Sequence, residues 1–189
     1  MRLSTPLSLF LLLSLLQINH SANADQANTF GLGRPVDAAE IKAWDIDVRP
    51  DGKGLPVGSG NVQSGAKIYA KRCAACHGQN GEGGPFDALV GRISGDAFPF
   101  GREPGATKTI GNYWPYATTV FDYINRAMPY DAPGSLQTDE VYALVAYLLY
   151  RNEIVSSDTE LSEQNLAEII MPSRSRFVPD NRQGGPEIR

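Results

Sequence analysis

Two cysteines and a histidine stand close together in the chain, as Cys73-Ala74-Ala75-Cys76-His77. Cysteines three positions apart lie one turn apart on a helix, so both thiols face the same side. Two such thiols can add to the two vinyl groups on one edge of a porphyrin, and the adjacent imidazole then lies under the ring, where it can bind iron. C-x-x-C-H is the attachment sequence for c-type haem. The motif therefore predicts one covalently bound haem c, with His77 as an iron ligand.

Three other sites use cysteines at this spacing. A thioredoxin-like redox pair needs a strand–helix–strand setting, and no strand pattern precedes Cys73. Tetrahedral zinc takes four ligands, but the chain has two cysteines and two histidines, and His20 lies in a segment that we expect to be removed. A carboxylate as the fourth ligand leaves Cys76 and His77 adjacent on one helix, a poor geometry for zinc. A disulfide across so short a loop adds little stability. Haem is favoured over all three.

The iron also needs a ligand opposite the histidine. Haem iron in electron carriers commonly takes a methionine thioether there, which raises the reduction potential. Met128 precedes Pro129 in a loop between two expected helices, whereas Met171 lies in a tail rich in proline and arginine. We expect Met128 to be the ligand. Ligation by Met171, an open position, and core packing of either methionine are the alternatives.

Other side chains are candidates for the haem environment. The second ring nitrogen of His77 needs an acceptor, and the carbonyl of Pro85, in the glycine-rich loop after the motif, is our candidate. Aromatic side chains in the run 112–116 can pack on the haem edge and donate to the propionates, and nearby cations can neutralise those carboxylates. A solvated charge or an ordinary core aromatic is an equally good interpretation of each. The candidates are Arg92, Lys108, Trp114, Tyr116 and Arg126.

The apolar spacing predicts three helices that position these residues, over 64–76, 116–127 and 138–149. We expect Ser64 and Thr138 to cap the first and third, and Met128-Pro129 to end the second. A short helix over 37–43 and another within 160–170 are possible. No strand pattern and no internal repeat is found.

The first 24 residues resemble a secretory signal, with Arg2, an apolar run, and Ala22-Asn23-Ala24 at its end. A retained membrane anchor is the alternative, but the apolar run is short of the about 20 residues that a bilayer requires. We expect cleavage after Ala24, no membrane anchor and a periplasmic protein.

The chain of 189 residues, with 42% hydrophobic residues and a net charge of −4, suits one domain with flanking segments and argues against a nucleic-acid-binding surface. Proline and glycine recur through residues 25–60, which we interpret as an extended arm lying on its own domain or on a partner. Residues 61–155 form the predicted cytochrome c domain, and residues 156–189 a C-terminal extension.

Several motifs, taken in order, resemble the class I c-type cytochromes: Gly65-x-x-x-Tyr69-x-x-x-Cys73, Gly84-Pro85 and Met128-Pro129. The resemblance implies an all-α class I cytochrome c fold with haem-wrapping loops, in which the N- and C-terminal helices cross. In it, Gly65 would meet Leu144 and Tyr147, Pro85 would serve His77, and Met128 would be the distal ligand.

A narrower resemblance covers nearly the whole chain beyond the leader. Four segments resemble the cytochrome subunit of Sox-type sulfane dehydrogenases, whose relatives serve sulfite dehydrogenases: Gly31–Pro35, Trp44–Gly52, Gly111–Ala117 and Ile124–Tyr130. The resemblance implies a molybdopterin-containing partner subunit, wrapped by the arm (residues 30–60) and by the tail. The best-known members are larger dihaem proteins, whereas this chain has one C-x-x-C-H.

Together these features predict a periplasmic monohaem cytochrome that takes electrons one at a time from a molybdenum-dependent sulfur-compound dehydrogenase. It passes them to a downstream cytochrome or oxidase and has no substrate of its own. Three alternatives remain: a free diffusible electron shuttle, a haem enzyme or gas sensor with an open distal site, and a module without haem. A free shuttle would purify without a partner, and an open-site haem protein would bind carbon monoxide tightly when reduced. A module without haem would show no haem absorption.

Overall fold

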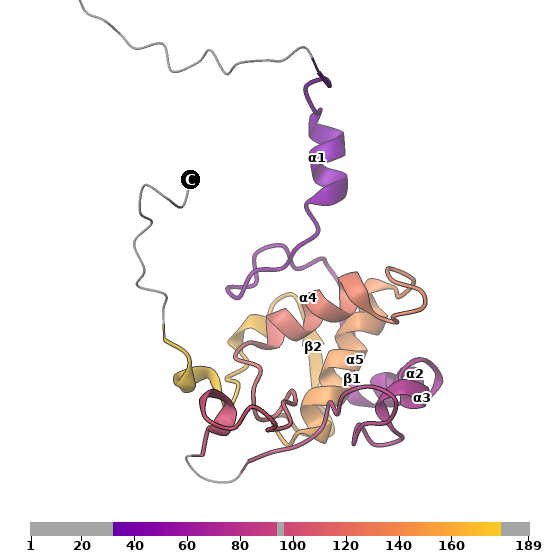
Figure 1. The fold of residues 1–189 in the computed structure, drawn as a ribbon. Coiled ribbons are helices and arrows are strands. Elements are labelled where there is room, and N and C mark those ends of the chain that lie inside the picture. The colour runs from indigo at the N-terminus through magenta and orange to yellow at the C-terminus, as the bar shows by residue number, and fades with distance from the viewer. Residues whose placement is uncertain (1–31, 94–96, 179–189) are drawn as a thin grey trace, which may run out of the picture. The chain divides into compact units, whose positions relative to one another are not determined.

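The computed structural model describes residues 32–93 and 97–178 (Figure 1), so the expected leader lies outside the described residues. The chain divides into two units, residues 1–40 and 41–189. Within the described ranges, no helix is both long and apolar enough to cross a bilayer. Helices dominate the structure, as the sequence predicts.

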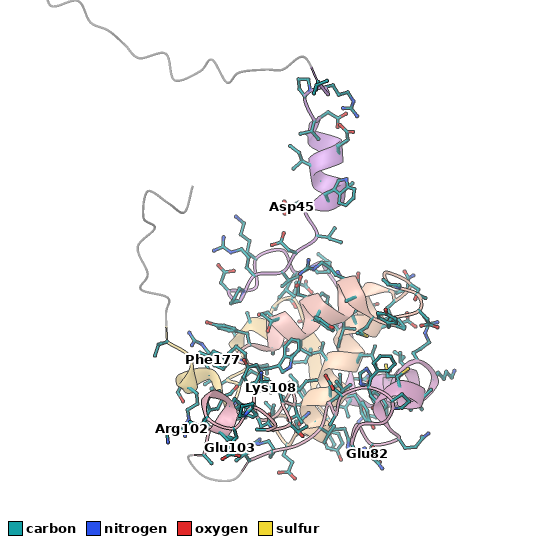
Figure 2. All side chains as sticks on the ribbon, in the orientation of Figure 1. Asp45, Glu82, Arg102, Glu103, Lys108 and Phe177 are labelled. Carbon is teal, nitrogen blue, oxygen red and sulfur yellow. The ribbon has the colours of Figure 1, made fainter. Side chains whose placement is uncertain are left out.

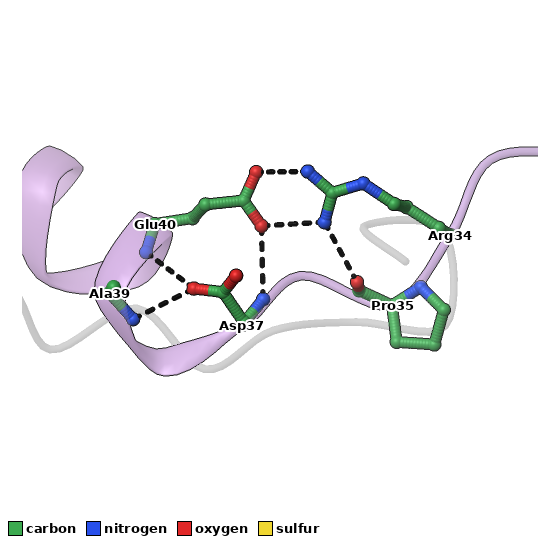
Figure 3. Close-up of polar contacts among 5 residues, drawn as sticks. All are labelled: Arg34, Pro35, Asp37, Ala39 and Glu40. Carbon is green, nitrogen blue, oxygen red and sulfur yellow. Dashed lines mark hydrogen bonds and ion pairs between the residues drawn. The ribbon is translucent and has the colours of Figure 1, made fainter.

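Helix α1 (Ala38–Trp44) begins at a double cap and lies close to the expected range. The Asp37 carboxylate accepts hydrogen bonds from the backbone N–H groups of Ala39 and Glu40, each at 2.9 Å. The Glu40 carboxylate accepts from the Asp37 N–H at 3.1 Å and pairs with the guanidinium of Arg34 (Figure 3). These contacts stabilise the first turn, although α1 buries no side chain.

The cysteine motif follows helix α2 (Val62–Arg72) and occupies helix α3 (Ala74–His77). The sequence predicted Ser64 as the cap of this region, which is wrong. Helix α2 begins two residues earlier, and the side chain of Asn61 accepts a hydrogen bond from the Ser64 N–H at 2.9 Å. An Asn side chain caps a helix at least as well as a serine, so the helix extends back to the end of strand β1.

The core is built on helix α5 (Thr138–Arg151), every residue of which from Val141 to Leu149 is buried. Helix α4 (Ala117–Ala127) packs against it with a buried face of its own, and it ends before Met128-Pro129, as predicted. The prediction that Thr138 caps α5 is wrong by one residue. Thr138 is the first helical residue, and the backbone N–H of Gln137 donates to the Glu140 carboxylate at 2.9 Å.

Helices α2 and α5 cross in close contact at Gly65. A Cβ atom at this position would lie 1.9 Å from the carbonyl oxygen of Ala143 and 2.7 Å from the Cβ of Tyr147. The predicted contact with Tyr147 is confirmed, and the nearest atom is the backbone carbonyl oxygen of Ala143. At this crossing α2 therefore approaches the backbone of α5.

A short antiparallel ladder joins strand β1 (Ser59–Asn61) to strand β2 (Glu160–Ser162), with Gly60 opposite Leu161. The sequence predicts no strand and allows a short helix within 160–170, where the structure has β2 and the 3₁₀ turn η2 (Leu166–Glu168). Strands of three residues are too short to show alternation, and Leu161 is buried by its position beneath α5 rather than by a local pattern. Two more 3₁₀ turns are η1 (Pro99–Gly101) and η3 (Arg174–Arg176).

The second half of the arm packs on its own domain. Val48 is buried, and its N–H donates to the carboxylate of Asp122 on α4 at 2.8 Å. Further along, the Tyr142 hydroxyl of α5 donates to the Pro56 carbonyl at 2.9 Å. This part of the arm therefore lies on its own domain, one of the two expected placements.

Candidate haem site

The motif is wound tightly where α2 ends. Cys73 occupies the break between α2 and α3, and its carbonyl accepts from the N–H groups of Cys76 and His77 at 3.1 and 3.0 Å. Both cysteines are free and partly exposed, so no disulfide joins them. Burial raises the pKa of the Cys73 thiol to about 11, with Arg72 opposing and Cys76 adding to the rise.

The ring of His77 is oriented by the loop that follows it. Its Nδ1 lies 2.8 Å from the carbonyl oxygen of Asp87. The sequence predicted Pro85 for this role, and the structure corrects it by two residues. The Phe86 N–H donates to the carbonyl of Cys76 at 3.1 Å, so the loop is joined to the motif directly after Pro85. The carbonyl that reaches the His77 ring is therefore that of Asp87, the residue after Phe86. With Nδ1 engaged, Nε2 is the nitrogen available to iron.

The two methionines have different environments. Met128 ends α4 in an extended conformation and is only partly buried against the core. The ring of Phe86 lies 6.3 Å from that of His77 and 6.1 Å from that of Tyr130, so the loop after His77 reaches the loop that carries Met128. Met171, in contrast, is 1% exposed and belongs to the core. It fills the packing role that methionine commonly has.

Arg92 is held by the end of α5. Its guanidinium donates to the carbonyls of Asn152 at 3.1 Å and Glu153 at 3.4 Å. Asn152 is completely buried, and its side chain also holds the backbone of Gly91. The position of Arg92 is therefore fixed by a hydrogen-bond network of the protein itself.

The two aromatic candidates lie between α4 and the C-terminal extension. The ring of Trp114 is partly buried and meets the ring of Tyr123 edge-on at 5.7 Å. The carbonyl of Trp114 accepts from the Ser173 hydroxyl at 2.7 Å. The guanidinium of Arg174 lies over the ring of Tyr116, 4.6 Å from its centre.

The remaining two cations have protein partners. Arg126 is exposed and pairs with Asp122, one turn earlier on α4. Lys108 lies over the ring of Tyr113, 4.7 Å from its centre. Within residues 32–93 and 97–178, no group of three or more His, Cys, Asp or Glu side chains is arranged to hold a metal ion. The zinc alternative therefore has no fourth ligand in this part of the chain.

Comparison with known proteins bears on this donor set. A family model described as cytochrome c oxidase, cbb3-type, subunit III, matches residues 60–148. A cytochrome c of Sesamum indicum is 33% identical over 100 residues, covering 47% of this chain and 88% of that protein. A chain in the crystal structure of the sulfane dehydrogenase SoxCD from Paracoccus pantotrophus is 41% identical, with a TM-score of 0.70, over 82% of this chain and 74% of that one. This chain belongs to the cytochrome c family.

The cytochrome has the class I fold that its motifs predicted. Its family is one of electron carriers and implies haem c. The donor set fits that group, because it offers two free thiols, an imidazole with one nitrogen engaged, and a thioether at the end of a neighbouring helix. A thiosulfate dehydrogenase of Psychrobacter arcticus is 29% identical over 93 residues, 48% of this chain; the cytochrome spans about a quarter (26%) of that protein's length.

Two residues of the cytochrome site escaped the sequence analysis. Asp87 supplies a backbone carbonyl, which any residue type can supply, so no sequence signal marks it. Asn152 stands three residues after the helix predicted over 138–149 and directly after α5, where a polar side chain usually caps or turns the chain. Its complete burial depends on the loop at Gly91 folding back over it, and that loop is distant in sequence.

Proposed function

We propose that this cytochrome is a periplasmic monohaem protein that accepts single electrons as a subunit of a molybdenum-dependent sulfane or sulfite dehydrogenase. The observation that most supports this is the likeness to SoxCD at 41% identity, which covers 82% of the chain and thus reaches beyond the family-matched residues 60–148. The single C-x-x-C-H supports one haem, and the signal-like segment 1–24 supports export.

Each site residue has a distinct part in this proposal. Cys73 and Cys76 would hold the haem covalently, and His77 and Met128 would bind its iron. Bound haem supplies a one-electron iron couple, whose potential depends on the ligands and on exposure to water. The Asp87 carbonyl keeps the His77 ring oriented. Arg92, Trp114 and Tyr116 belong to the surroundings, while the pairing of Arg126 with Asp122 gives Arg126 a separate role.

The first part of the arm is the proposed contact with the dehydrogenase subunit. Large apolar side chains are exposed there without a core to cover them. Trp44 is 86% exposed and Ile41 is 52% exposed on α1, and Ile46 follows at 50%. The cap made by Asp37 and Glu40 preforms α1, which lowers the entropy lost on docking. Aromatic side chains of this kind commonly anchor protein interfaces.

Isolation of the native protein from its source tests this function. We expect a tagged cytochrome to bring down a second subunit, and the complex to contain molybdenum and haem in fixed ratio. Trp44→Ala is expected to weaken this association, whereas Val57→Ala, at a side chain that is 85% exposed elsewhere on the arm, leaves it unchanged. Recovery of the haem protein alone would favour the diffusible shuttle.

A further inference from the structure

The C-terminal extension does not leave the domain after the core is complete. Leu166 and Met171 are 0% and 1% exposed, so the extension is anchored in the core. Directly after this anchor, three residues contact the loop that leads into α4. We call residues 173–177 the tail clamp.

The tail clamp contacts three closely spaced loop residues. The buried hydroxyl of Ser173 donates to the Trp114 carbonyl at 2.7 Å. Arg174 covers the ring of Tyr116, at 4.6 Å.

The third contact is an aromatic cluster at the end of the tail clamp. Phe177 meets the rings of Tyr113 and Phe98 edge-on, at 5.5 and 5.7 Å. Figure 2 labels Phe177 on the same side of the domain as Lys108. The ammonium group of Lys108 lies over the ring of Tyr113, one of the two rings that Phe177 contacts. Edge-to-face pairs of this kind each add about 0.5 to 1.5 kcal/mol beyond their buried area. The tail clamp is therefore held on the domain by specific side-chain contacts.

The held loop is connected to two residues of the proposed site. It runs directly into α4, which ends at Met128. It also contributes Asn112 to the lining of a polar hollow of about 420 Å³, together with Arg92 and, from the tail, Ser173 and Arg176. The tail clamp thus borders the same hollow as a cation that we assign to the haem surroundings.

From these contacts we infer that the tail clamp is a positioning element for the haem, acting through Trp114 and Tyr116. The inference rests on the proposed function, because it concerns the environment of the haem that Cys73 and Cys76 attach. Ser173 and Phe177 are positioning residues that fix the loop. Without them the loop admits water to the haem edge. Water stabilises the oxidised form, which carries one more positive charge, so the reduction potential falls.

Five variants of the full-length holoprotein test this. Ser173→Ala removes one hydroxyl, and Phe177→Ala removes the ring. Ile170→Ala and Val178→Ala are matched controls, since their side chains are 85% and 86% exposed and flank the clamp. Covalent haem is measured on a denaturing gel, the midpoint potential by spectroelectrochemistry and stability by thermal unfolding. Phe177→Tyr keeps the ring and serves as the conservative variant.

We expect all variants to keep covalent haem, and Ser173→Ala and Phe177→Ala to have midpoint potentials below both controls, with Phe177→Tyr restoring the wild-type value. Lower stability with an unchanged potential overturns the inference, because the clamp is then only structural. Wild-type potentials in both clamp variants also overturn it. A wild-type protein without covalent haem overturns the proposed function, and the inference with it.

Discussion

The side-chain oxygen of Asn152 accepts a hydrogen bond from the backbone N–H of Gly91 at 3.0 Å, which ties the end of α5 to the loop before Arg92. The amide group of Asn152 donates to the carbonyls of Leu89 and Leu148 at 3.1 and 2.8 Å. The oxygen and the NH₂ group of the Asn152 side chain are thus both hydrogen-bonded, and the residue is completely buried. A buried amide that is fully paired specifies one arrangement of the loop.

Replacing Asn152 by alanine leaves the Gly91 N–H without its acceptor, whereas the carbonyls of Leu89 and Leu148 still accept from the backbone N–H groups of Ile110 and Asn152. We expect Asn152→Ala to lose about 1 to 3 kcal/mol of unfolding free energy, since a buried polar group left unpaired costs that much. Urea unfolding of the holoprotein measures this loss. Asn80→Ala at the exposed surface is the control, with a loss of at most about 0.5 kcal/mol. An equal, small loss in both variants would show that the network adds nothing.

Alanine at each of the two methionines separates their roles. Met128→Ala is expected to lower the midpoint potential sharply and to let carbon monoxide bind the reduced protein, because the iron loses its thioether. Met171→Ala is expected to leave the potential and the spectrum unchanged and to cost about 2 to 5 kcal/mol of stability, as truncation of a buried side chain does. The opposite pattern would make Met171 the ligand.

The crossing of α2 and α5 has no room for a methyl group at Gly65. We expect Gly65→Ala to lose about 3 kcal/mol or more of stability, because the new Cβ clashes with backbone atoms, which cannot change rotamer as a side chain can. Gly101→Ala is the matched control, since nothing lies within 4 Å of the Cβ that it adds. Thermal unfolding of the two holoproteins compares them. A wild-type melting temperature for Gly65→Ala would refute the close crossing.

The ion pair of Arg126 and Asp122 predicts a difference between its two partners. Arg126→Ala is expected to cost at most about 1 kcal/mol and to leave the midpoint potential unchanged, because the Arg126 side chain is 48% exposed and water screens its charge. Asp122→Ala is expected to cost more, since the buried Val48 N–H also loses its acceptor. A lower potential in Arg126→Ala would restore the sequence-based expectation that this cation neutralises a haem propionate.

Tyr142 links stability to alkaline pH. Burial raises the pKa of its hydroxyl above the usual value of 10.0, and the charge of Glu163 raises it further. The unfolded chain therefore loses this proton first, so the contribution of the hydroxyl is complete below about pH 10 and is lost as the pH rises further. We expect Tyr142→Phe to cost about 1 kcal/mol at pH 7 and to show a shallower decline above pH 10. Denaturant unfolding at both pH values measures this.

The sequence predicted those features that depend on residues close together in the chain. C-x-x-C-H indicated the haem motif, Met128-Pro129 indicated the end of α4, and the apolar stripe of α5 indicated the core helix. The helix caps were displaced by one to three residues, because Asn61 competes with Ser64 for the same role. The order of the motifs also carried the fold class, which the comparisons confirm.

Features that depend on distant parts of the chain were not predictable. The acceptor for His77 is a backbone carbonyl, which carries no residue signature. Strand β2 exists only because β1 lies beside it, about a hundred residues earlier in sequence. The same holds for Phe177, whose ring is placed by aromatic partners in another loop. In each case the determining contact joins segments that no local pattern relates.

The ladder between β1 and β2 has a practical meaning for anyone who wants a minimal version of this electron carrier. A gene fragment cut at the boundaries of the family-matched segment, 60–148, would sever one strand and delete the other, stripping Leu161, Leu166 and Met171 from the underside of the core. Such a fragment would expose apolar surface and aggregate. A usable miniature must keep both flanks, from before the buried Val48 to the end of the clamp.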